Sequence, residues 1–315
     1  MRGGTLAVIA GPTGVGKTEL CLTLAERWGC DVVNCDSRQI YRDLPIGTAA
    51  PTQQEQQRAR HWFVGTHRLE EDYNAGAYER DAVELLGRLM AQHKGDMPFA
   101  ILSGGSMLYM DAVCYGLDDI PSVPAEIRRS IQQKYAEHGI EWLQSRVMKL
   151  DPDYWETVDR QNPQRLIHCL EVTEHTGTPY SVFRRKRRAS RPWRTVTIGL
   201  QRPREELYAR INSRVDAMMQ AGLEDEARQA LGRFGTEPPN SLKTVGYSEM
   251  AKYFSGEYTL EEAVSMIKQN SRRYAKRQMT WLRAKKEIVW LDASLPADRL
   301  AQEAEDIIRN EEYGF

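Results

Sequence analysis

The strongest constraint on this chain is a glycine-rich segment close to its N-terminus. Residues 6–18 are LAVIAGPTGVGKT, in which five apolar residues predict a buried strand and the rest fits G-x-x-x-x-G-K-[ST] at every fixed position. A helical pattern follows at once. Strand, glycine turn and helix in this order form a phosphate-binding loop, because successive N–H groups and the helix N-terminus point at one anion. The segment therefore predicts a site for a diphosphate or a triphosphate.

Two side chains of this loop have roles of their own. Lys17 supplies a mobile positive charge to a phosphate group, and the Thr18 hydroxyl is a candidate ligand for Mg²⁺. The remaining residues contribute their backbone. We assign the diphosphate-binding site to Gly11, Pro12, Thr13, Gly14, Val15, Gly16, Lys17 and Thr18.

Two further predicted strands end in polar segments. Residues 31–36 predict a short strand that leads into Asp36-Ser37-Arg38-Gln39, and residues 98–102 predict a buried strand that leads into a second glycine turn, residues 103–106. The carboxyl ends of parallel strands line the ligand crevice of an open sheet, so both segments should lie beside the phosphate-binding loop. Asp36 is therefore a candidate functional carboxylate. The alternative role for its side chain is an N-cap of the turn that follows.

The middle of the chain differs in composition from both ends. Residues 41–75 predict irregular structure with one short helix, and a helix should follow over 75–93. From about 118 to 191 there are helical patterns broken by prolines and no convincing strand. The 315-residue chain therefore predicts one α/β core, residues 1–118 and 192–315, with a helical insertion domain over 119–191.

The α/β pattern returns after the insertion. Strands are predicted over 196–200 and 288–291, with long helices over 204–231 and 260–286 between them. Together with the three earlier strands they predict a doubly wound parallel sheet. On the first long helix Arg210 and Arg214 share one face. Arg210 has Glu206 as a possible ion-pair partner, whereas Arg214 has no acid at that spacing and is freer to bind an external anion.

Positive charge is concentrated in two places, although the net charge is −1. Between Arg184 and Arg194 seven of eleven residues are Arg or Lys, and the helix over 260–286 carries a second cluster mixed with Tyr274 and Trp281. Basic residues next to aromatic ones suit the phosphates and unstacked bases of RNA. A solvated surface is the alternative for the first cluster, and inward packing of the aromatic rings is the alternative for the second.

Several functional classes are disfavoured. No apolar run has the length of a membrane span and no signal-peptide pattern is present, so we expect a cytoplasmic protein without a membrane partner. The five cysteines lack C-x-x-C spacing and are expected to be reduced thiols.

The residues alone leave two enzyme classes open. One is a kinase or NTPase that acts on RNA, and the other is an enzyme that holds a diphosphate as a leaving group. The strand over 98–102 ends in Ser103-Gly104-Gly105 and not in the Mg²⁺-binding Asp usual in nucleoside-triphosphate hydrolases, which disfavours motor-type NTPases and leaves kinases open. A non-enzymatic RNA-binding module would leave the phosphate-binding loop without a purpose.

The motif blocks of the chain resemble those of the tRNA dimethylallyltransferase (isopentenyltransferase) family. The most specific are D-S-x-Q-x-Y at 36–41 and A-K-R-Q-x-T-W at 275–281. Further blocks, at 104–109, 162–166, 210–215 and 246–247, follow in family order. The resemblance implies a P-loop NTPase-like fold and transfer of a dimethylallyl group from its diphosphate to N6 of adenine 37 in tRNAs reading codons that start with U. A relative that alkylates free adenine nucleotides is the alternative, and a P-loop kinase is a more distant one.

The resemblance also implies roles for individual residues. Asp36 would accept the proton of the adenine amine, Arg214 would grip the diphosphate, and Thr18 would hold Mg²⁺, so these three form the catalytic set. The inserted domain would clasp the anticodon arm. Contacts to tRNA are implied for Asp36, Ser37, Arg38, Gln39, Ser106, Arg128, Gln164, Arg165, Leu166, Ile167, His168, Lys243, Thr244, Val245, Gly246, Tyr247 and Ser248.

Two departures within the resemblance are informative. Ser106 stands where the family usually has Thr, so its hydroxyl is retained and only the packing should change. No zinc finger of the eukaryotic type follows the core, which indicates a bacterial-type enzyme. We expect it to act as a monomer.

Overall fold

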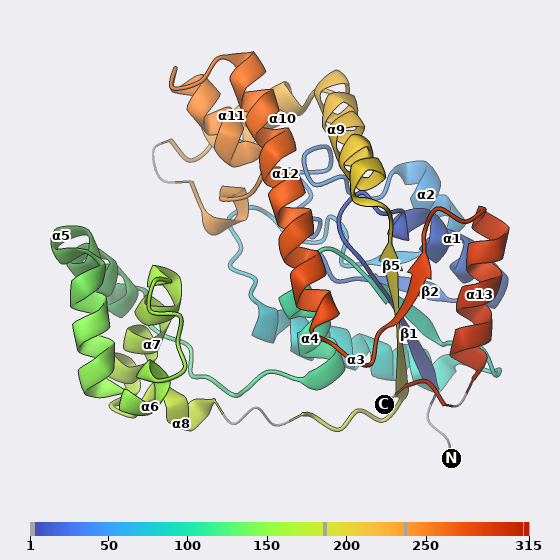
Figure 1. Ribbon diagram of the computed structural model, residues 1–315, viewed down its shortest axis with the longest axis horizontal. Helices are drawn as coiled ribbons and strands as arrows, with labels where there is room; N and C mark the ends of the chain where they lie inside the picture. The colour runs from blue at the N-terminus through green and yellow to red at the C-terminus, as the bar shows by residue number, and fades with distance from the viewer. Residues whose placement is uncertain (1–3, 185–187, 236–237, 311, 315) are drawn as a thin grey trace. The chain divides into compact units, whose positions relative to one another are not determined.

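The computed structural model describes residues 4–184, 188–235, 238–310 and 312–314. It divides into two compact units (Figure 1). The first consists of Met1–Cys114 and Ser190–Phe315, and the second of Tyr115–Ala189. The insertion predicted over 119–191 overlaps the second unit.

A six-stranded parallel sheet forms the centre of the first unit, and the predicted α/β class is confirmed. The strands are ordered β3-β2-β4-β1-β5-β6, so β1 is paired with β4 on one side and β5 on the other. Because β2, β4 and β1 are neighbours, the three polar segments that follow them meet at one edge of the sheet. The strands are β1 (Thr5–Ala10), β2 (Asp31–Asn34), β3 (His61–Trp62), β4 (Ala100–Ser103), β5 (Arg194–Gln201) and β6 (Val289–Asp292).

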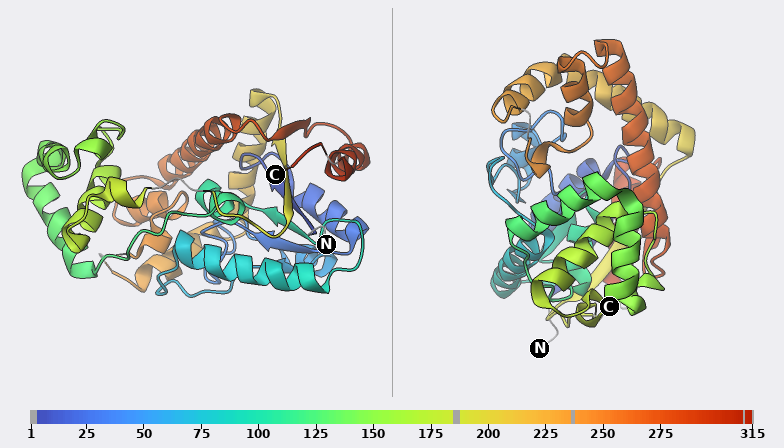
Figure 2. Two further views of the ribbon diagram at one scale, coloured as in Figure 1. Left: turned by 90° about the horizontal axis from the view of Figure 1, so that it is seen from below. Right: turned by 90° about the vertical axis from the view of Figure 1, so that its left-hand side faces the viewer.

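Helices on the sheet bury the central strands. Helices α1 and α13 lie side by side and share a core with β1 and β5 (Figure 1 and Figure 2). A second core forms around α10, α11 and α12 and includes Ile40 and Leu44 from the segment after β2. The helices of this unit are α1 (Lys17–Trp28), α2 (Gln53–Arg58), α3 (Ala75–Gln92), α4 (Met107–Tyr115), α9 (Arg204–Gln220), α10 (Leu223–Gly232), α11 (Tyr247–Phe254), α12 (Leu260–Arg283) and α13 (Ala297–Arg309).

Three elements differ from the prediction. The helix predicted over 204–231 is two helices, because Gly222 adopts a left-handed conformation with φ of 100° that no helix can continue through. Strand β3 was not predicted, since two residues are too few to show an alternating pattern. Helix α13, whose apolar residues pack on α1, was not predicted either.

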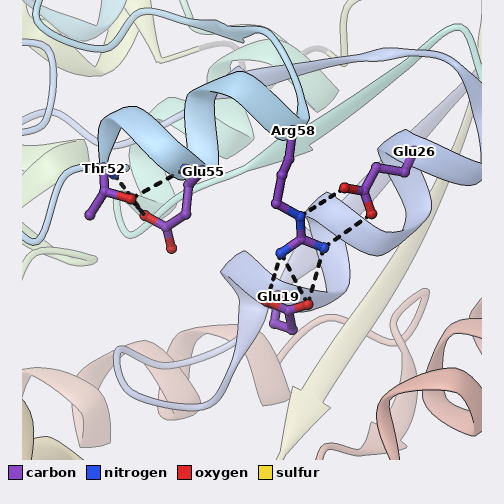
Figure 3. Close-up of polar contacts among 5 residues, drawn as sticks. All are labelled: Glu19, Glu26, Thr52, Glu55 and Arg58. Atoms are coloured by element: carbon purple, nitrogen blue, oxygen red, sulfur yellow. Dashed lines mark hydrogen bonds and ion pairs between the residues drawn. The ribbon is translucent and has the colours of Figure 1, made fainter.

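Helix α2 is attached to α1 by charged side chains (Figure 3). Thr52 and Glu55 form a capping box that starts the helix. At its other end the Arg58 guanidinium donates to Glu26 at 2.7 Å and to Glu19 at 3.1 Å. The segment after β2 is thereby fastened beside the helix that begins at the phosphate-binding loop.

The second unit is helical, as predicted, with a core of its own. It contains α5 (Ala125–Leu150), α6 (Pro152–Trp155), α7 (Pro163–Thr176) and α8 (Tyr180–Phe183), and α5 packs against α7 (Figure 2). Its fully buried carboxylate, Asp151, caps α6 through the Tyr154 N–H at 3.0 Å and accepts the Ser181 N–H at 2.7 Å. Asp151 therefore connects α6 to α8.

The sequence predicts neither a membrane-spanning helix nor disulfide bonds. Among the residues that the structure describes, no helix combines the length and the apolar character that a membrane crossing needs. All five cysteines are buried free thiols.

The turn after β4 yields a stability prediction with a matched control. A Cβ at Gly104 would lie 2.4 Å from the Cys35 carbonyl carbon and 2.7 Å from the Asp36 nitrogen, so Gly104→Ala must separate the β4 turn from β2. We expect a loss of about 1–3 kcal/mol in the free energy of unfolding. Gly87, inside α3, has nothing within 4 Å of such a Cβ, so Gly87→Ala should gain up to about 1 kcal/mol. Urea unfolding followed by circular dichroism measures both, and equal midpoints would contradict the prediction.

Candidate active site

The phosphate-binding loop, Gly11–Thr18, connects β1 to α1. Gly14 has φ of 81° and a Cβ there would lie 2.9 Å from the Ile211 side chain, so the loop can pack under α9 only with glycine. Gly16 is the left-handed N-cap of α1, which begins at Lys17. The N-terminus of α1 therefore faces the interior of the loop, as the sequence predicted.

Three cationic side chains surround the loop. The Lys17 ammonium donates to the carbonyl oxygens of Gly11 at 2.9 Å and Pro12 at 3.0 Å. Arg214 donates to the Thr13 hydroxyl at 3.1 Å, and Arg210 donates to the Gly14 carbonyl at 2.9 Å. The ion pair considered for Arg210 is wrong, because Glu206 pairs with Arg202.

Burial and the repulsion between neighbouring cations lower the pKa values of Lys17 and Arg214. Burial, and then the charge of Arg214, lower the pKa of Lys17 from 10.5 to about 8. Burial, and then the charge of Arg210, lower the pKa of Arg214. An anion held among them would relieve the repulsion, so the cluster is suited to a multiply charged ligand.

Asp36 has the capping role considered for it, and its second oxygen remains available for the functional role that the sequence predicts. Its Oδ1 accepts the N–H groups of Arg38 at 2.8 Å and Gln39 at 3.3 Å, which is the capping role. Its Oδ2 lies next to Gly105, where a Cβ would come within 2.4 Å. One oxygen thus holds the turn, and the missing side chain of Gly105 makes room for the other.

Two cavities meet at Asp36. The anion cavity, about 670 Å³, is lined by the phosphate-binding loop with Lys17, Thr18, Arg210 and Arg214. The neighbouring cavity, about 490 Å³, is lined by Ser37, Arg38, Ser106, 243–246 and Ser248. Six residues line both cavities: Thr13, Asp36, Thr48, Ala49, Arg214 and Tyr274. The carboxylate therefore stands between the cavity of the phosphate-binding loop and a separate compartment.

Helix α12 supports this junction through two residues that the sequence analysis gave no such role. The Gly105 carbonyl accepts from the Tyr274 hydroxyl at 2.8 Å and from the Gln278 amide at 2.7 Å. The Gln278 carbonyl in turn accepts the Thr13 N–H at 2.9 Å. Tyr274 packs inward, as one of its two interpretations held. The sequence does show Gln278 as a polar residue one turn from Tyr274 on the same face of a basic helix, but it does not show which segments Gln278 connects.

The serine that replaces the usual threonine keeps its hydrogen bonds. Ser106 Oγ accepts the Ser37 N–H and donates to the Ser37 hydroxyl, both at 2.9 Å. These bonds tie the turn after β4 to the turn after β2.

Residues 45–49 form a wall whose last three residues line the neighbouring cavity, and side chains of α10 and α11 support it from the opposite side. Glu226 accepts the N–H groups of Ile46 and Gly47 at 2.8 Å each, and the Tyr247 hydroxyl also donates to it. From the cavity side, Gln39 donates to the Thr48 carbonyl at 3.0 Å. Tyr247 is fully buried, so a tRNA contact through its side chain is wrong. It supports the wall instead.

The remaining implied tRNA contacts lie in the second unit. On α7, Gln164, Arg165 and His168 are exposed, and on α5 Arg128 is exposed beside Glu171. Leu166 and Ile167 are buried in the core of the unit, which excludes their side chains from contact with RNA.

The basic run from Arg184 to Arg194 is not a single open patch of charge. Arg191 donates to the carbonyl of Val113 and pairs with Glu79, and Arg194 donates to the carbonyl of Asn310. Trp193 is buried, and Arg184 lies over the ring of Tyr154. The prediction of a phosphate surface is wrong for Arg191 and Arg194, and residues 185–187 lie outside the described residues.

Comparison with known proteins gives one consistent result. The family model described as "IPP transferase" matches residues 39–285. The chain is 50% identical to the tRNA dimethylallyltransferase 1 of Bacteroides thetaiotaomicron over 286 residues, 91% of each chain. Its structure is similar to the full-length tRNA isopentenylpyrophosphate transferase of Bacillus halodurans, with a TM-score of 0.69, 34% identity and coverage of 98% of this chain and 96% of the other. It is also similar to a eukaryotic dimethylallyltransferase acting on tRNA, with a TM-score of 0.76, 25% identity and coverage of 92% and 74%.

The pKa of Lys17 predicts how anion binding depends on pH. Burial and the charge of Arg214 lower this pKa to about 8, so above pH 8 the ammonium loses its proton and a bound anion must restore it. A non-reactive alkyl diphosphate serves as the ligand, because its phosphates are already ionised above about pH 6. Its dissociation constant should rise about tenfold for each pH unit above pH 8. Titration calorimetry from pH 7 to pH 10 measures this. Lys17→Met should bind weakly with no inflection near pH 8, and a flat profile for the unaltered protein would contradict the assignment.

The bridge made by Gln278 predicts a second effect. Gln278→Leu fills the same space but leaves the Thr13 N–H and the Gly105 carbonyl without this partner, at a cost of about 1–3 kcal/mol in stability. We also expect weaker binding of the alkyl diphosphate, because the loop loses a support. Gln278→Glu keeps the acceptor for Thr13, but its carboxylate would face the Gly105 carbonyl and add negative charge to the cavity, so it should also bind the diphosphate more weakly than the unaltered protein. Equal affinity in all three proteins would show that the bridge does not position the loop.

Proposed function

Because the chain belongs to the IPP transferase family, we propose that it transfers a dimethylallyl group from dimethylallyl diphosphate to N6 of adenine 37 in tRNAs that read codons starting with U. The products are N6-dimethylallyladenosine in tRNA and diphosphate. The observation that carries the proposal is the position of Asp36 at the junction of a second compartment with the cavity in which Lys17, Arg210 and Arg214 surround the phosphate-binding loop. This is where a donor and an acceptor would meet.

The anion cavity would receive the diphosphate of the donor. The N–H groups of the loop and the side chains of Lys17, Arg210 and Arg214 would stabilise the charge that builds on oxygen as the allylic C–O bond breaks. An arginine can bind two phosphate oxygens at once, which would hold the leaving group in one orientation. Burial, and then repulsion between neighbouring cations, lowers the pKa of Lys17 and Arg214, and a bound anion would compensate both effects and so favour binding.

Magnesium fits this cavity. The Thr18 hydroxyl lines it, and within the described ranges no group of three or more His, Cys, Asp or Glu side chains could hold a metal on its own. We propose that Thr18 holds Mg²⁺ together with the diphosphate oxygens, a ligand set that this ion commonly uses. When bound, it would add positive charge beside the leaving group.

The neighbouring cavity would receive the adenine, turned out of the anticodon loop. Asp36 Oδ2 would accept a hydrogen bond from the N6 amine and take its proton as the new C–N bond forms. A carboxylate is a weak base, so the proton should move late, when the nitrogen has become cationic. The base and its neighbours would be surrounded by Ser37, Arg38, Ser106, residues 243–246 and Ser248, which line this cavity. Gln39 lines the anion cavity instead and supports the segment at Thr48.

Two acceptors compete for this reaction, the adenine of a tRNA and the adenine of a free nucleotide. The names of the relatives support tRNA, since one is a tRNA dimethylallyltransferase and a solved structure is described as acting on tRNA. We further propose that Arg128, Gln164, Arg165 and His168 of the second unit bind the anticodon arm. The enzyme would act as a monomer in the cytoplasm, where its tRNA acceptor is found.

A transfer assay tests the reaction and the role of Asp36 together. Labelled dimethylallyl diphosphate and Mg²⁺ are offered to an anticodon stem-loop with adenines at 36–38, and to AMP in a parallel tube. We expect label in the stem-loop and a loss of about 10²–10⁴-fold in rate for Asp36→Asn.

The matched control for Asp36→Asn is Asp292→Asn, which alters another carboxylate at the end of a strand, β6, and should retain the rate. Label in AMP alone would move the protein to the free-nucleotide class. Label in neither, with ATP consumed instead, would favour a kinase.

A further inference from the structure

Arg202 is a largely buried cation that contacts the phosphate-binding loop from outside the anion cavity. It lies in the short connection between β5 and α9, and its side chain is 14% exposed. The guanidinium Nε donates to the Val15 carbonyl at 2.9 Å, and another nitrogen of the same group pairs with Glu206. The other cations around the loop line the anion cavity, whereas Arg202 lines neither cavity. The mechanism described above gives it no role.

The hydrogen bond to Val15 determines the direction of the next N–H group along the chain. The carbonyl of Val15 and the N–H of Gly16 belong to one planar trans peptide group, in which they point in opposite directions. Gly16 lines the anion cavity. Because Arg202 holds the carbonyl from outside this cavity, the Gly16 N–H is directed into it. Backbone N–H groups of this kind are the donors that a loop offers to phosphate oxygens.

A glycine at position 16 makes such an external contact important. Gly16 has φ of 115°, a conformation that glycine adopts without strain. Since glycine adopts many other conformations as readily, it does not fix the direction of the peptide group that precedes it. Leaving out the chain neighbours of Gly16, the one atom of the described residues within 4 Å of a Cβ built there is Arg202 Nη2, at 3.8 Å. Arg202 is therefore the side chain that restricts rotation of this peptide group.

We propose that Arg202 is a positioning residue, which orients the peptide group between Val15 and Gly16 so that the Gly16 N–H binds the diphosphate of the donor. The inference rests on the proposed function, because it takes a diphosphate as the ligand of the loop. Arg202 acts through the loop and does not touch the ligand. Because Glu206 balances its charge, its contribution comes from the hydrogen bond to Val15.

Two uncharged substitutions separate the hydrogen bond from the charge. In Arg202→Gln the amide nitrogen stands the same number of bonds from the backbone as Nε, so a donor to Val15 is kept. Arg202→Met has a similar length and no donor. Both variants remove the positive charge and leave Glu206 without this partner, so any difference between them reports the hydrogen bond alone.

Binding of inorganic diphosphate, measured by titration calorimetry, compares the two variants. The dissociation constant should rise about 10- to 150-fold in Arg202→Met, the range for one hydrogen bond to a charged group. In Arg202→Gln it should stay close to that of the unaltered protein. Equal loss in both variants would assign the effect to charge and overturn the proposal, and so would an unchanged affinity in Arg202→Met.

The matched control for the lost charge is Arg204→Met. Arg204 is exposed at the start of α9, and its guanidinium lies over the ring of Tyr208, 5.1 Å from the centroid. This substitution removes a positive charge two residues from Arg202 and leaves the Val15 contact in place. Diphosphate should bind to Arg204→Met as it does to the unaltered protein, and a loss as large as that in Arg202→Met would overturn the positioning role.

The amide signal of Gly16 gives a direct readout of orientation. In protein labelled with ¹⁵N at glycine, saturating diphosphate should move the Gly16 amide proton to lower field, because its N–H then donates to an anion. The shift should persist in Arg202→Gln and disappear in Arg202→Met. The signal of Gly87, inside α3, should be the same in all three proteins, which shows that each is folded. A Gly16 shift retained in Arg202→Met would overturn the proposal.

These measurements need no acceptor, so they are independent of the transfer assay. If Arg202→Met and Arg202→Gln differ as expected but no label reaches the stem-loop or AMP, the proposed function fails and the positioning role stands. If label is transferred but Arg202→Met binds diphosphate like the unaltered protein, the positioning role alone fails.

Discussion

The geometry of the candidate active site depends most on the hydrogen bonds of one buried side-chain amide, that of Gln278. Gln278 accepts from the phosphate-binding loop at Thr13 and donates to the turn after β4 at Gly105, so it joins two segments that follow different strands. Gly105 in turn borders the free oxygen of Asp36. Loop, turn and carboxylate are thereby fixed relative to one another by a residue of α12. A leaving group and an attacking nitrogen must be aligned to a fraction of an ångström, and this connection supplies the rigidity.

The electrostatics of the site complement that rigidity. Lys17, Arg210 and Arg214 are held close together, and burial, followed by the repulsion of a neighbouring cation, lowers the pKa of both Lys17 and Arg214. A folded chain tolerates such crowding where an anion is regularly bound. The same charges would stabilise a diphosphate more strongly after bond cleavage than before it, because cleavage adds negative charge to the oxygen that leaves. In the proposed reaction the crowded cations would thus serve both binding of the donor and departure of its diphosphate.

The sequence predicts the parts of the site that have fixed spacing and misses those that depend on folding. The phosphate-binding loop, Asp36 and the parallel sheet are predictable because glycine motifs and buried strands have local signatures. The bridge made by Gln278 joins residues 265 positions apart, and no local pattern encodes it. Gly222 breaks a helix that its periodicity alone would continue. Tyr247, Leu166 and Ile167 sit in motif segments, but the fold turns their side chains inward.

The two basic clusters show why charge density in a sequence is a weak guide to binding. The run from Arg184 to Arg194 is the denser one, yet Arg191 and Arg194 use their guanidinium groups on backbone carbonyls, because an extended segment offers many acceptors close by. The cluster on α12 is more dilute, and the helix uses its own carbonyls in its backbone hydrogen bonds, so its cations must find other partners. Arg272 donates to Asn212 and Lys285 pairs with Asp111. What distinguishes a binding surface is the absence of internal acceptors around the charge, and only the fold reveals it.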